Sequence, residues 1–140
     1  MKRHHVIAAA AAGAVLLVIA SRPARAQDWR PPTTAMPSMP ASAEVNDGWA
    51  GGQGRWFIAS AGVKARAEGS GPRARFVRFT GGDMRTVAAW SDRNGDGRCD
   101  MVEVYREGSL AAQLIDPDYD GTANVMRVYS GGNLVREERL

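Results

Sequence analysis

The sequence predicts an all-β fold, an antiparallel meander of β-hairpin repeats that follows a disordered N-terminal leader. A ring residue followed three positions later by glycine and five positions later by an aliphatic residue occurs three times, beginning at Phe79, Tyr105 and Tyr129. Each copy places a glycine turn between two short runs of alternating residues, which is typical of a β-hairpin. Glycines also interrupt almost every window that is long enough to form a helix.

The N-terminus has the pattern of a cleavable targeting segment. Residues 1–5 are basic, residues 6–20 are apolar, and Ala24-Arg25-Ala26 is a small-residue cleavage motif. We expect a signal peptide over 1–26 that is cleaved after Ala26, and hence a periplasmic or secreted product. No later apolar run approaches the roughly 20 residues that a membrane-spanning helix needs, so the sequence predicts no membrane span.

Cleavage would change the charge balance and remove both histidines. The full chain has 18 Lys and Arg against 15 Asp and Glu, and four of the basic residues lie before the cleavage point, which leaves 14 against 15. A basic surface for nucleic acid is therefore not expected. Because His4 and His5 leave as well, histidine-activated nucleophiles and histidine-ligated zinc are excluded. We expect a protein that is not an enzyme; a carboxylate-dependent hydrolase is the alternative that needs no histidine.

The mature chain divides into two parts by composition. Residues 27–48 hold four prolines among Ala, Ser and Thr and show no hydrophobic period, which predicts an extended, mostly disordered leader. Residues 49–140 then form the β-hairpin repeat domain, in which the tryptophans are expected in the core. The strands are predicted at 55–60, 63–68, 74–80, 84–91, 101–106, 110–115, 125–130 and 133–138.

One connection between predicted strands has the spacing of a calcium loop. Residues 92–103 read D-R-N-G-D-G-R-C-D-M-V-E, with oxygen-bearing side chains at positions one, three, five, nine and twelve and glycine at six. Ca²⁺ takes six to eight hard oxygen ligands, which alternating donors before a sharp turn can supply. The candidate metal ligands of this first loop are Asp92, Asn94, Asp96, the carbonyl of Arg98, Asp100 and Glu103.

A degenerate copy of this loop follows 24 residues later. Residues 116–127 read D-P-D-Y-D-G-T-A-N-V-M-R and match positions one, three, five and six. Asn124 replaces the acid at position nine, and Arg127 replaces the glutamate at position twelve. The candidate ligands of this second loop are Asp116, Asp118, Asp120, the carbonyl of Thr122 and Asn124. Two acidic loops are thus expected to join three successive hairpins.

These residues resemble known families. The first loop, at 92–103, is similar to EF-hand and related D-x-D-x-D-G calcium loops, and the hairpins loosely resemble MORN-type repeats. The second loop, at 116–127, is similar to the proline-second loops of lanmodulin, a periplasmic lanthanide binder, and to thrombospondin-type calcium repeats. The resemblance implies a Ca²⁺ ion, or alternatively a lanthanide or trace metal, as the bound partner and a structural or binding role. No protein or ligand partner follows from it.

Three interpretations stay open at this level. Glu103 lies on a predicted strand, so it either ligates the ion or forms a cross-strand ion pair with Arg127. Each loop is either a metal site or a solvated acidic turn, because Asn-Gly and Asp-Gly are common turn dipeptides. Cys99, the only cysteine, is expected as a buried small hydrophobic residue rather than a redox group.

Overall fold

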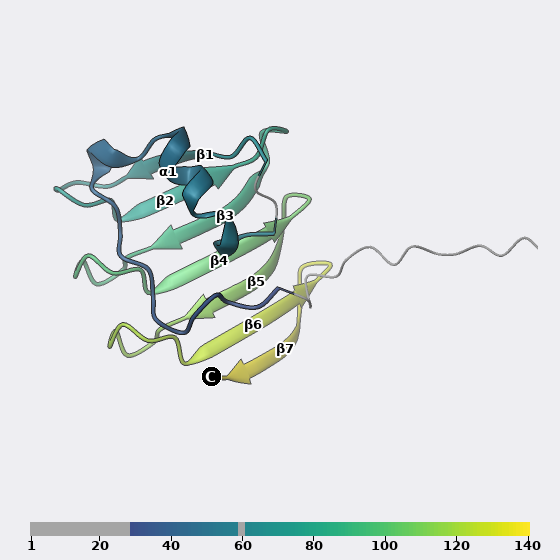
Figure 1. The fold of residues 1–140 in the computed structure, drawn as a ribbon. Coiled ribbons are helices and arrows are strands. Elements are labelled where there is room, and N and C mark those ends of the chain that lie inside the picture. Colours follow the sequence, from purple (N-terminus) through teal and green to yellow (C-terminus); the bar gives the residue numbers. More distant parts are fainter. Residues whose placement is uncertain (1–28, 59–60) are drawn as a thin grey trace, which may run out of the picture.

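The computed structural model describes residues 29–58 and 61–140, and within these residues it has one antiparallel sheet of seven strands in sequence order. The sheet is a plain meander, in which each strand pairs with the next (Figure 1). The strands are β1 (Lys64–Glu68), β2 (Phe76–Thr80), β3 (Thr86–Ser91), β4 (Met101–Arg106), β5 (Ser109–Ile115), β6 (Val125–Ser130) and β7 (Asn133–Arg139). The predicted antiparallel meander is confirmed, and seven of the eight predicted strands match.

The predicted strand at 55–60 is wrong over its described residues. Residues 54–56 form a 3-10 turn that follows helix α1 (Asp47–Gly52), and another 3-10 turn covers Ser42–Glu44. Helix α1 begins after Asn46, whose side chain accepts a hydrogen bond from the Trp49 N–H at 2.9 Å, a normal N-cap. The apolar pair Trp56 and Phe57 mimics a strand in sequence, but both side chains pack down onto the sheet.

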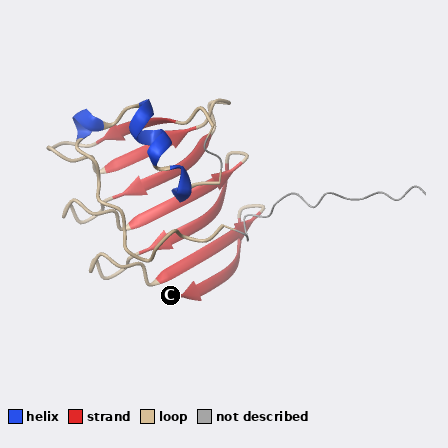
Figure 2. Cartoon of the chain, viewed as in Figure 1, coloured by secondary structure: helices blue, strands red, loops and turns tan. Residues whose placement is uncertain are grey.

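One face of the sheet carries the core. Alternation places the valines, alanines and rings of the central strands on this face, where helix α1 and the following turn cover them (Figure 2). Phe79 and Trp90 lie at its centre with ring centroids 5.1 Å apart, and Trp56 meets Trp90 at 6.0 Å. Trp56 and Trp90 are 3% and 1% exposed, which confirms that these tryptophans belong to the core.

The two edges at which the strands end have different connections. The glycine turns of the three hairpins lie at one edge, as predicted, and each of the three ring residues, Phe79, Tyr105 and Tyr129, lies directly beside a β-bulge. The longer connections lie at the opposite edge (Figure 1). These are the β1–β2 loop, the first acidic loop between β3 and β4, and the second acidic loop between β5 and β6. The topology therefore stacks the two acidic loops side by side.

The predicted leader needs a correction over its described residues, 29–48. Residues 29–42, here called the strap, first cross the face of the sheet beside β6 and then run along the loop edge to α1 (Figure 1). The strap is extended, as expected, but it is packed against the sheet: Trp29, Met36 and Met39 are 9%, 8% and 0% exposed. The folded unit therefore begins well before residue 49, because these apolar side chains complete the core.

Backbone hydrogen bonds fix the strap with a period of three residues. The strap forms isolated antiparallel bridges at Ala35, Ser38 and Ala41, one to each of the three loops. Three residues of polyproline-type chain advance about 9 Å, and two strand spacings are about 9.5 Å, so each repeat spans one loop interval. The strap carbonyls that accept from the loops are those of Thr34, Pro37 and Pro40, and the N–H groups that donate are those of Met36, Met39 and Ser42.

Two further sequence predictions concern the signal peptide and membrane spans. The predicted signal peptide, residues 1–26, lies outside the described residues. Within the described residues, no helix is long and apolar enough to cross a membrane.

Candidate metal centre

The two acidic loops share one hydrogen-bond framework around their position-six glycine. The Gly97 N–H donates to Oδ2 of Asp92 at 3.0 Å, and the Gly121 N–H donates to Oδ2 of Asp116 at 2.8 Å. Both glycines have a positive φ, 85° and 91°, which a residue with a side chain rarely adopts. The loops are thus built alike, and their differences in chemistry lie in the side chains.

A second shared bond positions the carboxylate at position five. The Arg98 N–H donates to Oδ1 of Asp96 at 2.8 Å, and the Thr122 N–H donates to Oδ1 of Asp120 at 2.7 Å. Each of these N–H groups belongs to the residue that bridges to the strap. The loops and the strap therefore form one continuous backbone network.

In the first loop, the acidic and amide oxygens are occupied by donors from the protein itself. The other oxygen of Asp92 accepts the Gly95 N–H at 2.6 Å. Asn94 accepts from the Asp96 N–H and donates its amide to Oδ2 of Asp96, both at 3.1 Å. These bonds stabilise the loop without an ion.

The acid at position nine of the first loop has an arginine partner. Asp100 is 2% exposed, and its Oδ1 lies 2.6 Å from Nε of Arg93. Its Oδ2 accepts the Arg93 backbone N–H. The hydrogen bond to Asp100 raises the pKa of Arg93, against the lowering effect of burial. A positive charge from the loop's own second residue thus neutralises the buried carboxylate.

Glu103, at position twelve, faces away from the loop toward its neighbours on the sheet. It lies in β4, where Oε1 accepts from the Gln113 side chain at 2.9 Å and Oε2 from the Tyr105 hydroxyl at 3.2 Å. The alternative ion pair with Arg127 is wrong, because β5 lies between the two strands and Gln113 separates the two side chains in register. Arg127 instead pairs with Glu137 at 2.8 Å.

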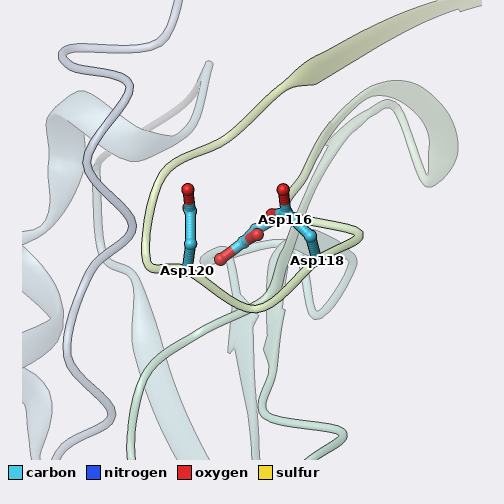
Figure 3. A group of neighbouring side chains, drawn as sticks. All are labelled: Asp116, Asp118 and Asp120. Carbon is cyan, nitrogen blue, oxygen red and sulfur yellow. The ribbon is translucent and has the colours of Figure 1, made fainter.

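The second loop brings three carboxylates together. Asp116, Asp118 and Asp120 each offer an oxygen, and these atoms lie within 4.8 Å of one another (Figure 3). This is the one such group of three or more acidic, cysteine or histidine side chains in the described residues. Because Ca²⁺–oxygen distances are 2.3–2.6 Å, two ligands of one ion are separated by at most about 5 Å. The cluster could therefore hold a metal ion.

Two buried oxygens of the second loop have no donor. Asp116 is 1% exposed, and its Oδ1 has no hydrogen-bond partner within the described residues. The same holds for Oδ1 of Asn124, at position nine. Native proteins rarely leave buried polar atoms unpaired, since the cost is about 1–3 kcal/mol. Both atoms belong to residues that the loop pattern assigns as ligands.

Burial raises the pKa of Asp116, because desolvation disfavours the carboxylate. The N–H groups of Gly121 and Tyr119 lower this pKa, whereas the nearby acids Asp118 and Asp120 raise it. The Tyr119 N–H thus lies close enough to this carboxylate to lower its pKa, although it does not reach hydrogen-bond geometry with Oδ1. The second loop thus holds a poorly compensated negative charge, which a cation would relieve.

Two arginines of the first loop contact the second. The Arg93 guanidinium lies over the Tyr119 ring, 5.6 Å from its centroid. The Arg98 guanidinium lies so close to Gly121 that a Cβ atom there would collide with it. The first loop therefore supports the second loop from the side.

Cys99, at position eight of the first loop, is fully buried, which confirms the expected role of a small core residue. Burial raises the pKa of its thiol to about 12. The residue at the same position of the second loop, Ala123, is also buried, at 1%. Position eight of both loops thus anchors the loop to the core, below the strap.

The sequence identified the residues of both loops but not the difference between them. At position nine that difference depends on position two, where Arg93 supplies donors and a charge to Asp100 and Pro117 supplies neither. At position one it depends on position four, where the Gly95 N–H donates to Asp92 and Oδ1 of Asp116 has no such partner in the described residues. Comparison with known proteins gives no match, whether to a family model, to a characterised protein or to a solved structure. The function of the site is therefore argued from its own chemistry.

Proposed function

We propose that the second acidic loop binds one Ca²⁺ ion and that the bound ion orders the loop edge of this β-meander. The observation that carries the proposal is the buried, unpaired Oδ1 of Asp116 beside the carboxylates of Asp118 and Asp120. Carboxylate oxygens are the ligands that Ca²⁺ prefers. An ion at this position would supply the missing partner and neutralise the cluster.

The proposed ligands come from alternate residues of the loop. The carboxylates of Asp116, Asp118 and Asp120 would supply three oxygens, and the side chain of Asn124 would supply another, directly or through water. The carbonyl of Thr122 is a further candidate, because the N–H and C=O of an extended residue point to the same side, and this N–H already meets Asp120.

The affinity is expected to be modest. Position twelve, which supplies a bidentate glutamate in an EF-hand, is Arg127, and this arginine pairs with Glu137. Water would therefore complete the coordination shell. Extracellular calcium modules bind at about 10⁻⁴–10⁻³ M, and the predicted export of this chain agrees with such a site.

The first loop would act as a structural copy that needs no ion. Its carboxylates already accept N–H groups of the loop, and Arg93 takes the place of a cation beside Asp100. This assignment reverses the order that the sequence pattern favours, in which the first loop is the better match. The proposed role of the site is therefore structural and binding.

Terbium luminescence tests the proposal. Tyr119 lies within the second loop and would sensitise the emission of bound Tb³⁺. We expect sensitised emission from the full chain, displacement by millimolar Ca²⁺, and loss of emission in Asp120→Asn but not in Asp96→Asn. The two substitutions remove the same carboxylate from equivalent loop positions. Emission that only lanthanides displace would indicate a lanthanide carrier, and absence of emission would reject the metal site.

A further inference from the structure

Gly121 connects the candidate metal site to the strap through its two backbone polar groups. Its N–H donates to Oδ2 of Asp116 at 2.8 Å, and its carbonyl accepts the Met36 N–H at 2.9 Å. The next residue but one, Ala123, donates to the Thr34 carbonyl at 2.7 Å. Gly121 thus links the proposed ligand Asp116 directly to the strap.

The first loop makes the same connection with fixed partners. The Gly97 N–H donates to Asp92, and the Gly97 carbonyl accepts the Met39 N–H at 2.9 Å. Because Asp92 has donors on both oxygens, this connection is complete in the absence of an ion. At the second loop, one oxygen of the corresponding aspartate has no partner in the described residues, so an ion in the cluster would add a contact that the first loop already has.

We propose that ion binding at the second loop controls the docking of the strap, so that the strap is a calcium-dependent latch. The inference rests on the proposed function of the loop. An ion that fixes Asp116 also fixes Gly121, and with it the acceptor for Met36. Backbone hydrogen bonds hold the strap at three loops, and Arg30 adds an exposed ion pair with Glu138 at 2.8 Å. Of the three loops, the one that contains the candidate ion site is the one that metal strengthens.

The release of the latch would begin at one end of the strap. The strap bonds successively to the second loop through Met36, to the first loop through Met39 and to the β1–β2 loop through Ser42. Without the ion, the Met36 end should open most often and the Ser42 end least often. Opening would expose the side chains of Trp29 and Met36, which cover the core.

Amide hydrogen exchange of the full chain, followed by NMR with and without Ca²⁺, tests this inference. We expect Ca²⁺ to slow the exchange of the Met36 amide by about fivefold or more, the lower end of typical coupling between sites. The Met39 amide should slow less, and the Ser42 amide least. In Asp120→Asn, Ca²⁺ should leave all three rates unchanged.

Terbium emission from the same samples separates the two possible failures. Bound ion with an unchanged Met36 exchange rate overturns the latch and leaves the metal site intact. Absence of bound ion overturns the metal site and the latch together. Equal slowing at Met36 and Ser42 also overturns the latch, because it would reflect a general stabilisation of the fold.

If ion binding strengthens the docking of the strap, then docking of the strap must strengthen ion binding by the same factor. Substitutions in the strap therefore give a reciprocal test. Met36→Pro removes the N–H that meets Gly121, while Met36→Ala removes the side chain and keeps the N–H. Ala35, the residue before the new proline, already forms an antiparallel bridge with Thr122, and an extended backbone is what a residue before proline prefers. We expect Met36→Pro to bind Ca²⁺ about fivefold more weakly than Met36→Ala. Equal affinities would overturn the latch.

Discussion

The Nε atom of Arg93 lies 2.6 Å from Oδ1 of Asp100, so the first loop carries its own cation. The equivalent residues of the second loop are Pro117 and Asn124, and Oδ1 of Asn124 has no partner in the described part of the chain. The two loops share one backbone framework, but they differ in whether their buried polar groups have partners within the protein. The better sequence match is satisfied internally, and the poorer match is the better candidate for a metal site.

Loss of the arginine should destabilise the first loop. Arg93→Ala leaves the buried Asp100 with the backbone N–H as its donor, and leaving a buried acceptor short of partners costs about 1–3 kcal/mol. Urea unfolding would measure this change. The double variant Arg93→Ala, Asp100→Asn should recover part of the loss, since it removes the buried charge; no recovery would argue against charge compensation.

Replacement of Asp116 should stabilise the metal-free chain at neutral pH. Because burial raises the folded-state pKa of Asp116, the folded chain binds a proton more tightly than the unfolded chain. The resulting penalty is present above the raised pKa and disappears as the pH falls toward the ordinary value of 3.8. Asp116→Asn removes this penalty, so its advantage in chelator should be larger at pH 7 than at acid pH.

Asp116→Asn should also lose the stabilisation that Ca²⁺ gives to the wild type. Urea unfolding of wild type and Asp116→Asn, at both pH values and with or without Ca²⁺, would show the two effects together. A variant that is less stable than the wild type in chelator at pH 7 would contradict the charge argument.

Gly121 should not tolerate a side chain. Its φ is 91°, and a Cβ atom would meet the Arg98 guanidinium. We expect Gly121→Ala to reduce the free energy of unfolding by about 1–3 kcal/mol from backbone strain, with an added cost from the contact. Gly132→Ala is the matched control, because Gly132 has a φ of 81° and nothing within 4 Å of the built Cβ. Equal losses in the two variants would show that the Arg98 contact is unimportant.

Cys99 should react slowly with thiol reagents in the native chain. Burial raises its pKa from 9.0 to about 12, which alone lowers the thiolate fraction about a thousandfold at pH 8. The rate of labelling with a disulfide reagent, compared between native and urea-unfolded chain, would measure the protection. Rapid native labelling would mean that the strap and the first loop open readily.

The strands could be predicted because the hairpin signal is local. Each glycine turn separates two runs whose apolar residues alternate, and the register of the strands follows from that alternation up to the bulges beside Tyr105 and Tyr129. The pattern at 55–60 predicts a strand because Trp56 and Phe57 are residues typical of strands. Their burial results from packing of Trp56 against Trp90 and of Phe57 against Phe79, which are contacts between distant parts of the sequence.

The strap could not be predicted from hydrophobic periods of 2 or 3.6. Its pattern repeats every three residues, as in Met36-Pro37 and Met39-Pro40. This repeat matches the spacing of the loops beside it, which are two strands apart. The spacing of ligand residues likewise does not show which of the two loops is the better candidate for a metal site. It depends on whether each oxygen has a donor. In the first loop the Gly95 N–H supplies a donor to Asp92, and Arg93 supplies donors to Asp100.

The melting temperature of three chains, with chelator and with saturating millimolar Ca²⁺, tests the central claim most directly. The chains are the wild type, Asp120→Asn and Asp96→Asn. Because a ligand that binds the folded state stabilises it by mass action, the metal-site proposal predicts that Ca²⁺ raises the melting temperature of the wild type and of Asp96→Asn but not of Asp120→Asn. A rise that is lost in Asp96→Asn and kept in Asp120→Asn, or no rise in the wild type, would contradict it.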